Sequence, residues 1–313
     1  MRIVFFGTPD LAVPCLAALT ARHEVTAVVC QPDRPKGRGK KLQAPPVKAW
    51  AEEHGLPVHQ PAKLNDGTFE AWLREQAPDL CALAAYGRIL KQPILAVPRH
   101  GFINMHPSLL PKYRGPSPIQ SAVLNGDAVT GVTIMDITLE MDSGDIYLQR
   151  ETPIGPDETA ADLTARLAEL GGAMMAEVAD AIEAGTATRT PQDDGQASYC
   201  ALLSKEDGFI DWNAPAQRIH DLVRGAQPWP AAQCRFHGEV CKILRSAVMP
   251  GDAGAAPGAI TAVEKDHVLV ATGGGQLAIL VFQVPGKKAM PMREYLVGHA
   301  LKVGEKFESM GNS

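Results

Sequence analysis

The sequence lacks several features that define common protein classes. Its six cysteines include no Cys-x-x-Cys pair, and four of them lie in apolar segments where a thiol acts as a small hydrophobic side chain. No apolar run approaches the roughly 18 residues that a membrane span needs. A strand-like run begins at Arg2, which leaves no room for a targeting peptide. We therefore expect a cytoplasmic protein in a reducing compartment, with no metal centre and no membrane partner.

An excess of positive charge is absent as well. The chain has 30 Lys and Arg against 35 Asp and Glu, a formal net charge of −5 at pH 7. Residues from Glu206 onward carry equal numbers of each sign, so the net negative charge lies in the first 205 residues. The net field therefore cannot attract a polyanion, and any contact with nucleic acid needs a local basic patch.

Two nucleotide-binding fingerprints are also missing. After the first apolar run, Gly7-Thr8-Pro9-Asp10 supplies one glycine and then a proline, where a dinucleotide site needs G-x-G-x-x-G. The cluster Gly37-Arg38-Gly39-Lys40-Lys41 lacks the spacing of a P-loop and the Ser or Thr that follows its lysine. We expect neither NAD nor a P-loop nucleotide.

What the first 185 residues do contain is an alternation of short β-rich runs with helical patterns. This alternation predicts βαβ units and a doubly wound, parallel-rich sheet. A helix is predicted from Thr159, as its N-cap, to Ala184, with Gly185 ending it. The runs expected as strands are Arg2–Gly7, Val25–Cys30, Leu80–Ala85, Phe102–Met105, Thr130–Asp136 and Asp145–Gln149, and the first helices are Asp10–Leu19 and Phe69–Gln76.

The character of the chain changes after residue 185. The stretch Thr186–Ser204 shows no clear period and is typical of a linker. Beyond it, short β-like runs are separated by Gly-rich turns, which favours a small antiparallel barrel. We expect a first domain over residues 1–189, a linker over 190–205 and an all-β, OB-like domain over 206–313.

One strand end carries candidate chemistry. Asn104 and His106 are two residues apart, so they share a face at the carboxyl end of a predicted parallel strand, where open α/β sheets bind ligands. Asp142 lies in the turn-rich stretch Met141-Asp142-Ser143-Gly144-Asp145. Amide and imidazole donors beside a carboxylate suit direct acyl transfer without a covalent nucleophile. Alternatively, the first two residues serve the strand end and Asp142 an Asx-turn.

These residues belong to a wider pattern. Asn104-x-His106, Ser108-Leu109-Leu110-Pro111, Tyr113-Arg114-Gly115 and Asp142 together resemble the signature of the 10-formyltetrahydrofolate-dependent formyltransferases. Within that family, further segments over about residues 1–300 resemble the methionyl-tRNA formyltransferases. These segments are Phe6-Gly7-Thr8-Pro9-Asp10, Gln31-Pro32-Asp33-Arg34-Pro35, Leu203-Ser204-Lys205-Glu206, Ile210-Asp211-Trp212, Pro228-Trp229-Pro230 and Pro285-Gly286-Lys287-Lys288-Ala289-Met290.

The resemblance implies a fold, an activity and partners. It implies a formyltransferase-type Rossmann domain followed by an OB-like barrel that contacts tRNA. We expect the protein to be a monomer. Its co-substrate would be 10-formyltetrahydrofolate, and its acceptor the free α-amine of initiator methionyl-tRNA, formylated for translation initiation. Asn104 and His106 would donate hydrogen bonds to the developing oxyanion, and Asp142 would hold His106 and help move a proton. Folate contacts would come from Tyr86, Gly87, Arg88, Ile89, Leu90, Ser108, Leu109, Leu110 and Pro111, although Leu109 and Leu110 suit core filling equally well.

A basic stretch interrupts the acidic first domain. Gln31–Lys48 carries six basic residues against the single acid Asp33. Such a run is usually only a solvated loop, but the resemblance implies contact with the tRNA and places the arginine that enters the acceptor end at Arg38. The candidate tRNA-binding residues are Arg34, Lys36, Arg38, Lys40, Lys41, Lys287 and Lys288. Two alternatives remain open: a formyltransferase acting on a sugar amine or other small amine, and a catalytically idle RNA-binding protein on the same scaffold.

Overall fold

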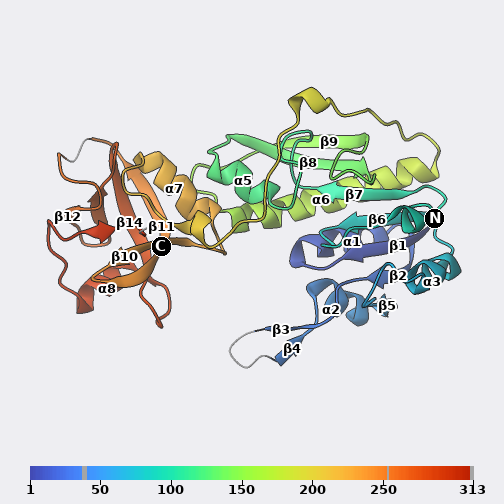
Figure 1. Ribbon diagram of the computed structural model, residues 1–313, viewed down its shortest axis with the longest axis horizontal. Helices are drawn as coiled ribbons and strands as arrows, with labels where there is room; N and C mark the ends of the chain where they lie inside the picture. The colour runs from blue at the N-terminus through green and yellow to red at the C-terminus, as the bar shows by residue number, and fades with distance from the viewer. Residues whose placement is uncertain (37–40, 252–253, 311–313) are drawn as a thin grey trace. The chain divides into compact units, whose positions relative to one another are not determined.

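The computed structural model describes residues 1–36, 41–251 and 254–310, and the chain divides into two compact units (Figure 1). The first unit comprises Met1–Pro118, Val129–Pro153 and Thr164–Cys200, and the second comprises Ile119–Ala128, Ile154–Leu163 and Ala201–Ser313. The domain boundaries predicted at residues 189 and 206 stay a prediction. Among the described residues, no helix is long and apolar enough to cross a membrane.

The first unit is built on a seven-stranded sheet in the order β5-β2-β1-β6-β7-β8-β9. Neighbours from β5 to β7 pair in parallel, and β8 and β9 are antiparallel additions at one edge. The predicted parallel-rich, doubly wound sheet is confirmed. The strands are β1 Arg2–Gly7, β2 Glu24–Val29, β5 Val58–His59, β6 Leu80–Ala84, β7 Phe102–His106, β8 Val129–Asp136 and β9 Ile146–Pro153.

The order of strands reverses between β1 and β6, the kind of point at which open α/β sheets form their ligand crevice. The segments that leave these two strands meet there, because Thr8 Oγ1 donates a hydrogen bond to the Tyr86 carbonyl at 3.1 Å. Under them, Phe6 packs edge-on against Tyr86 with ring centroids 5.5 Å apart. The helices of this unit are η1 Asp10–Ala12, α1 Val13–Thr20, α2 Pro46–Glu53, α3 Thr68–Gln76, α4 Gln92–Leu95, most of α6 Ala160–Glu183, and η2 Asp194–Gln196, whereas all but the first residue of α5 Pro118–Leu124 belongs to the second unit.

The start of helix α6 and its close packing on β7 each depend on a particular residue of the sequence. Thr159 Oγ1 accepts a hydrogen bond from the Asp162 amide at 3.2 Å, while Asp162 Oδ2 accepts from the Thr159 hydroxyl at 2.7 Å, so the predicted N-cap is confirmed. A Cβ on Gly171 would lie 2.7 Å from Cγ of Met105. This glycine therefore lets α6 approach β7 closely. Because side chains alternate along a strand, β7 offers Met105 to the helix and Asn104 and His106 to the opposite face.

The basic stretch contains a short hairpin. Strands β3 (Arg34–Lys36) and β4 (Lys41–Gln43) pair antiparallel and project from the body of the first unit beside α2 (Figure 1). Two of the predicted tRNA contacts, Arg38 and Lys40, lie outside the described residues.

The second unit contains a curled antiparallel sheet in the order β12-β13-β14-β11-β10-β16, with β15 paired to β14. This arrangement confirms the predicted all-β, OB-like half. Its buried core is centred on aromatic side chains, among them Trp212, Phe236, Phe282 and Phe307. The elements are η3 Glu206–Gly208, α7 Ala216–Gly225, β10 Ala232–Phe236, β11 Glu239–Met249, β12 Ile260–Val263, β13 Val268–Ala271, β14 Gln276–Gln283, β15 Met290–Pro291, α8 Met292–Gly298 and β16 Phe307–Glu308.

Candidate functional site

A cavity of about 230 Å³ in the first unit brings together residues that the sequence predicted for two different tasks. It is formed by β6, β7, the segment after β6 and the turn that follows β8. Asn104 and Asp142 both line it. The full lining is Leu83, Arg88, Ile89, Leu90, Asn104, Met135, Ile137, Thr138, Leu139, Glu140, Met141 and Asp142.

Asn104 leaves hydrogen-bonding capacity unused at this cavity. Its side chain is buried, and among the described residues its Oδ1 atom has no hydrogen-bond partner. An unsatisfied buried polar group costs about 1–3 kcal/mol, so native structures rarely keep one without a reason. An amide held in this way is suited to bind a polar group of a ligand.

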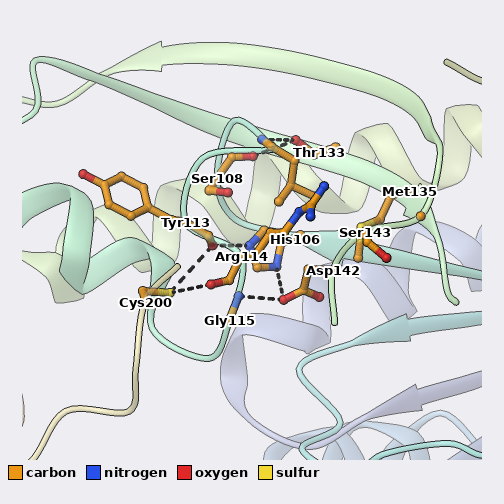
Figure 2. Close-up of polar contacts among 12 residues, drawn as sticks. His106, Ser108, Tyr113, Arg114, Gly115, Thr133, Met135, Asp142, Ser143 and Cys200 are labelled. Carbon is orange, nitrogen blue, oxygen red and sulfur yellow. Dashed lines mark hydrogen bonds and ion pairs between the residues drawn. The ribbon is translucent and has the colours of Figure 1, made fainter. Parts of the chain in front are cut away.

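His106 is the last residue of β7 and lies against Asp142 (Figure 2). Its Nε2 atom is 2.9 Å from the Tyr113 carbonyl oxygen, and its Nδ1 atom is 3.7 Å from Oδ2 of Asp142. Because a carbonyl can only accept, Nε2 carries the proton and the lone pair of Nδ1 faces the carboxylate in the neutral ring. Burial lowers the pKa of His106, although Asp142 and the Tyr113 carbonyl both act to raise it. The ring is therefore neutral at pH 7 and able to accept a proton at Nδ1.

Asp142 is held in an unusual backbone conformation. Its φ of 51° lies in the left-handed region, which residues other than glycine seldom adopt. Its Oδ2 atom accepts a hydrogen bond from the Gly115 amide at 2.8 Å (Figure 2). The same oxygen therefore faces both Gly115 and His106, in a residue that lines the cavity.

The predicted donation from His106 to a substrate oxygen stays a prediction. Both ring nitrogens face groups of the chain itself, and the ring lies behind Asp142 rather than in the lining of the cavity. The contacts suit a proton acceptor better than an oxyanion donor.

Three of the predicted folate contacts, Arg88, Ile89 and Leu90, line the cavity. The Arg88 guanidinium donates to the carbonyls of Pro61 and Ala62 at 2.9 and 3.2 Å, which fixes this wall. Ile89 is 84% exposed and presents an apolar face at the rim.

Tyr86 and Gly87 support that wall from behind. Tyr86 is fully buried, and the Gln31 amide donates to the carbonyls of Tyr86 and Gly87 at 2.9 and 3.3 Å. Gly87 has a φ of 76°, and a Cβ there would lie 2.6 Å from Nε2 of Gln31. The turn thus depends on both a glycine and its glutamine partner.

The predicted folate contacts at Ser108, Leu109, Leu110 and Pro111 lie outside this lining. Ser108 is fully buried and its hydroxyl donates to the Lys112 carbonyl at 2.6 Å. Thr133 Oγ1 accepts from the Leu110 amide and donates to the Ser108 carbonyl. In the structure these residues shape the loop between β7 and Tyr113, and their contact with folate stays a prediction.

Several lining residues escaped the sequence analysis. Leu139 and Met141 are 66% and 60% exposed and add apolar surface to the rim opposite Ile89. They lie in a turn without hydrophobic periodicity, where only their position next to Asp142 could have drawn attention to them. Two polar residues behind the site, the buried Arg114 and the half-buried Gln192, were likewise not assigned a role.

Three of the predicted tRNA contacts are exposed, one in the first unit and two in the second. Arg34, in β3, is exposed and donates to Oε1 of Gln31 at 2.5 Å. Lys287 and Lys288 are exposed in the turn between β14 and β15 of the second unit. Within the described part of the chain, no group of three or more His, Cys, Asp or Glu side chains could hold a metal ion.

The parallel-rich sheet and the curled second sheet are those of a known class of enzyme. Residues 1–179 match the formyl transferase family model, and residues 202–300 match the model of its C-terminal domain. The chain belongs to the formyl transferase family. A methionyl-tRNA formyltransferase from Geobacter metallireducens is 46% identical to it over 97% of both chains, which confirms the resemblance seen in the sequence.

Solved structures share the fold. An N-formyltransferase from Helicobacter canadensis, in complex with folinic acid and dTDP-3-aminofucose, matches with a TM-score of 0.69 and 20% identity over 91% of this chain and 99% of that one. HypX from Aquifex aeolicus, in complex with tetrahydrofolic acid, matches with a TM-score of 0.66 and 19% identity over 99% of this chain. The present chain spans about half of HypX, 51% of its length. At these identities the likeness shows the fold alone.

Proposed function

We propose that this chain transfers the formyl group of 10-formyltetrahydrofolate to the α-amine of methionyl-initiator tRNA. The observation that carries the proposal is the meeting of Asn104 and Asp142 in one cavity, with the neutral ring of His106 directly behind the carboxylate. Near-complete coverage at 46% identity by a methionyl-tRNA formyltransferase supports the acceptor.

The residues around the cavity fit a folate. Ile89, Leu139 and Met141 offer apolar surface for flat rings, and Asn104 offers an unpaired amide oxygen deeper inside. Pockets for small ligands combine such apolar walls with a few converging polar groups. When bound there, the folate supplies the formyl carbon as the electrophile.

Each of the three polar residues has a separate task in this mechanism. The Asn104 amide donates to the formyl oxygen, which becomes negatively charged as the amine attacks. Asp142 orients the amine and takes its proton, because its carboxylate reaches the cavity. The proton then passes from Oδ2 of Asp142 to Nδ1 of His106, where it converts a 3.7 Å contact into an ion pair. As the intermediate collapses, the bond between the formyl carbon and N10 of the folate breaks, and the proton returns through Asp142 to N10, so that tetrahydrofolate leaves.

No covalent enzyme intermediate is needed. An α-amino group titrates at roughly 7.7–8.0, so a substantial share of such amines is neutral and nucleophilic near neutral pH. The Ser108 hydroxyl is buried and bound to the Lys112 carbonyl, which leaves it unsuited to act as a nucleophile. The protein needs only to hold the amine beside the formyl carbon and to stabilise the negative charge that develops on the formyl oxygen.

The tRNA part of the proposal assigns phosphate contacts to the basic stretch and the second unit. Arg34, Lys36, Arg38, Lys40 and Lys41 would bind near the acceptor end, and Lys287 and Lys288 would bind elsewhere on the tRNA. The proposal also includes a cytoplasmic location, where initiator tRNA is charged, and a monomer as the active form.

The test is a comparison of acceptors with one donor. We expect formyl transfer from 10-formyltetrahydrofolate to methionyl-initiator tRNA with a kcat/KM at least 10³-fold above that for a dTDP-linked amino sugar or free methionine amide, an estimate of about 4 kcal/mol in transition-state binding. A higher kcat/KM for the amino sugar would replace the proposal with the small-amine alternative. Binding of tRNA without any transfer would favour the idle RNA-binding alternative.

A further inference from the structure

The turn that carries Asp142 is held by a residue outside the catalytic group. The Nε2 atom of Gln192 donates to the Asp142 carbonyl at 2.9 Å and to the Gly144 carbonyl at 2.8 Å. Both donors of the amide are thus used on two carbonyls of the same turn.

The other end of the Gln192 amide is equally engaged. Its Oε1 atom accepts from Nε and Nη2 of Arg114 at 3.1 and 2.8 Å. The orientation of the amide is therefore dictated by its neighbours, since a guanidinium can only donate and carbonyls can only accept. Arg114 is itself 3% exposed and also pairs with Asp194 at 2.6 Å, so Gln192 is anchored on a fixed base.

The segment that contains Arg114 also contacts Asp142 directly. The residue after Arg114 is Gly115, whose amide donates to Oδ2 of Asp142 at 2.8 Å. A Cβ on Gly115 would lie 2.2 Å from the Cys200 carbonyl oxygen, and the Cys200 amide donates a hydrogen bond to the Arg114 carbonyl at 2.8 Å. Asp142 is thus held at its carbonyl by Gln192 and at its carboxylate by Gly115.

The backbone of the turn needs such support. The φ of 51° at Asp142 is strained, and strained residues keep their conformation only where surrounding contacts determine it. Gly144 is confined as well, because a Cβ there would lie 2.0 Å from the Asp136 carbonyl oxygen. Without Gln192, two carbonyls lose their donor, and the turn is free to relax toward an ordinary conformation.

We propose that Gln192 is a positioning residue that fixes the carboxylate of Asp142 between the cavity and Nδ1 of His106. The inference rests on the proposed function in one respect, because the step that Asp142 serves is formyl transfer. It also assigns a catalytic consequence to residues 190–200, which show no periodic pattern in the sequence. A displacement of about 1 Å in a reacting group can slow a reaction about 10²-fold.

Two substitutions separate positioning from mere support of the fold. Gln192→Leu removes the side-chain hydrogen bonds to Arg114, Asp142 and Gly144. Gln192→Glu keeps an acceptor for Arg114, and adds opposite charge to that contact, but turns an oxygen toward the carbonyls of Asp142 and Gly144. If Gln192 only supports the fold through Arg114, Gln192→Glu should behave like the wild-type protein. If Gln192 positions Asp142, Gln192→Glu should still lower kcat.

The matched control is Gln196→Leu. Gln196 lies on the same segment, is exposed, and donates only to Asp193 at 2.7 Å. We expect it to retain the kcat, KM and thermal stability of the wild-type protein.

The experiment combines formylation kinetics with hydrogen exchange of the full-length protein. We expect kcat to fall between about 10- and 100-fold in both Gln192 variants, KM for methionyl-tRNA to stay within about threefold, and Gln192→Glu to keep the wild-type unfolding temperature within a few degrees. Amide exchange over residues 138–145 should rise in both variants and not in Gln196→Leu. The exchange readout does not depend on the reaction, so it separates failure of this inference from failure of the proposed function. Wild-type kcat in Gln192→Glu, or unchanged exchange over the turn, would overturn the inference.

Discussion

The Nδ1 atom of His106 lies 3.7 Å from Oδ2 of Asp142, just beyond hydrogen-bond reach. In the neutral ring, Nε2 donates to the Tyr113 carbonyl, and Nδ1 points an unshared pair at a carboxylate that already accepts a hydrogen bond from Gly115. A proton arriving at Nδ1 changes that contact from a repulsion to an attraction. The pair is therefore arranged to receive a proton during the reaction and to release it afterwards.

Asp142→Asn should lower the pKa of His106. Asp142 raises this pKa and burial lowers it, so removal of the charge leaves the effect of burial less opposed. We expect kcat for formylation to fall by about 10²-fold or more, as for loss of a general base. Titration of the His106 ring by NMR and steady-state kinetics check this, with Asp145→Asn in the same segment as the control. An unchanged His106 pKa would show that the two side chains do not interact.

His106 should also make the stability of the protein depend on pH. Its pKa is lower in the folded protein than in the unfolded chain, so the unfolded chain binds more protons as the pH falls below about 6.5. The free energy of unfolding should therefore decrease from pH 7 to pH 5, and His106→Gln should reduce this decrease. Urea unfolding at both pH values checks the prediction, with the exposed His100→Gln as control. His59, whose pKa burial also lowers, keeps part of the decrease in both variants.

Much of the first unit was predictable because its sheet is buried on both sides. Apolar runs mark β1, β6 and β7, and the two-residue spacing of Asn104 and His106 places both on one strand face, as the structure shows. The curled second sheet follows from short β-rich runs and their Gly-rich turns. In these elements local pattern and tertiary burial agree.

The parts that escaped prediction are held by contacts without a sequence period. Residues 190–200 have the composition of a linker, yet Ser198 and Cys200 form backbone hydrogen bonds with Pro111 and Arg114, and Gln192 reaches the Asp142 turn. Met141 lines the cavity from an exposed loop. Side-chain-to-backbone bonds between distant segments leave no repeating signal.

Gln31 should tune folate binding without touching the folate. Its amide holds the Tyr86 and Gly87 carbonyls, so Gln31→Ala loosens the turn that precedes the cavity wall. Loss of two hydrogen bonds, each worth about 1 kcal/mol, predicts a rise of up to about 30-fold in KM for 10-formyltetrahydrofolate with kcat nearly unchanged. Steady-state kinetics check this, and the exposed Gln43→Ala serves as control. A fall in kcat at an unchanged KM would show that Gln31 acts on the chemistry instead.

Arg38 should affect the binding of tRNA and not the binding of folate. If it contacts a phosphate near the acceptor end, Arg38→Ala lowers kcat/KM for methionyl-tRNA and reduces the slope of log affinity against log salt by about 1. The KM for folate should not change. Filter-binding titrations at several salt concentrations check the slope, with the exposed Arg99→Ala as control. Equal slopes for both variants would reduce the basic stretch to a solvated loop.

The most direct test of the account is the single-turnover rate of formyl-methionyl-tRNA formation, with both substrates saturating, in the wild-type protein and in Asn104→Ala. Asn104 lines the cavity, and its loss removes the side-chain Nδ2 group that donates to the developing oxyanion. The account predicts a rate reduced by on the order of 10²–10³, with tRNA affinity unchanged, while Asn213→Ala in the second unit retains the wild-type rate. A rate for Asn104→Ala within a few-fold of wild type would contradict the placement of the reaction in this cavity.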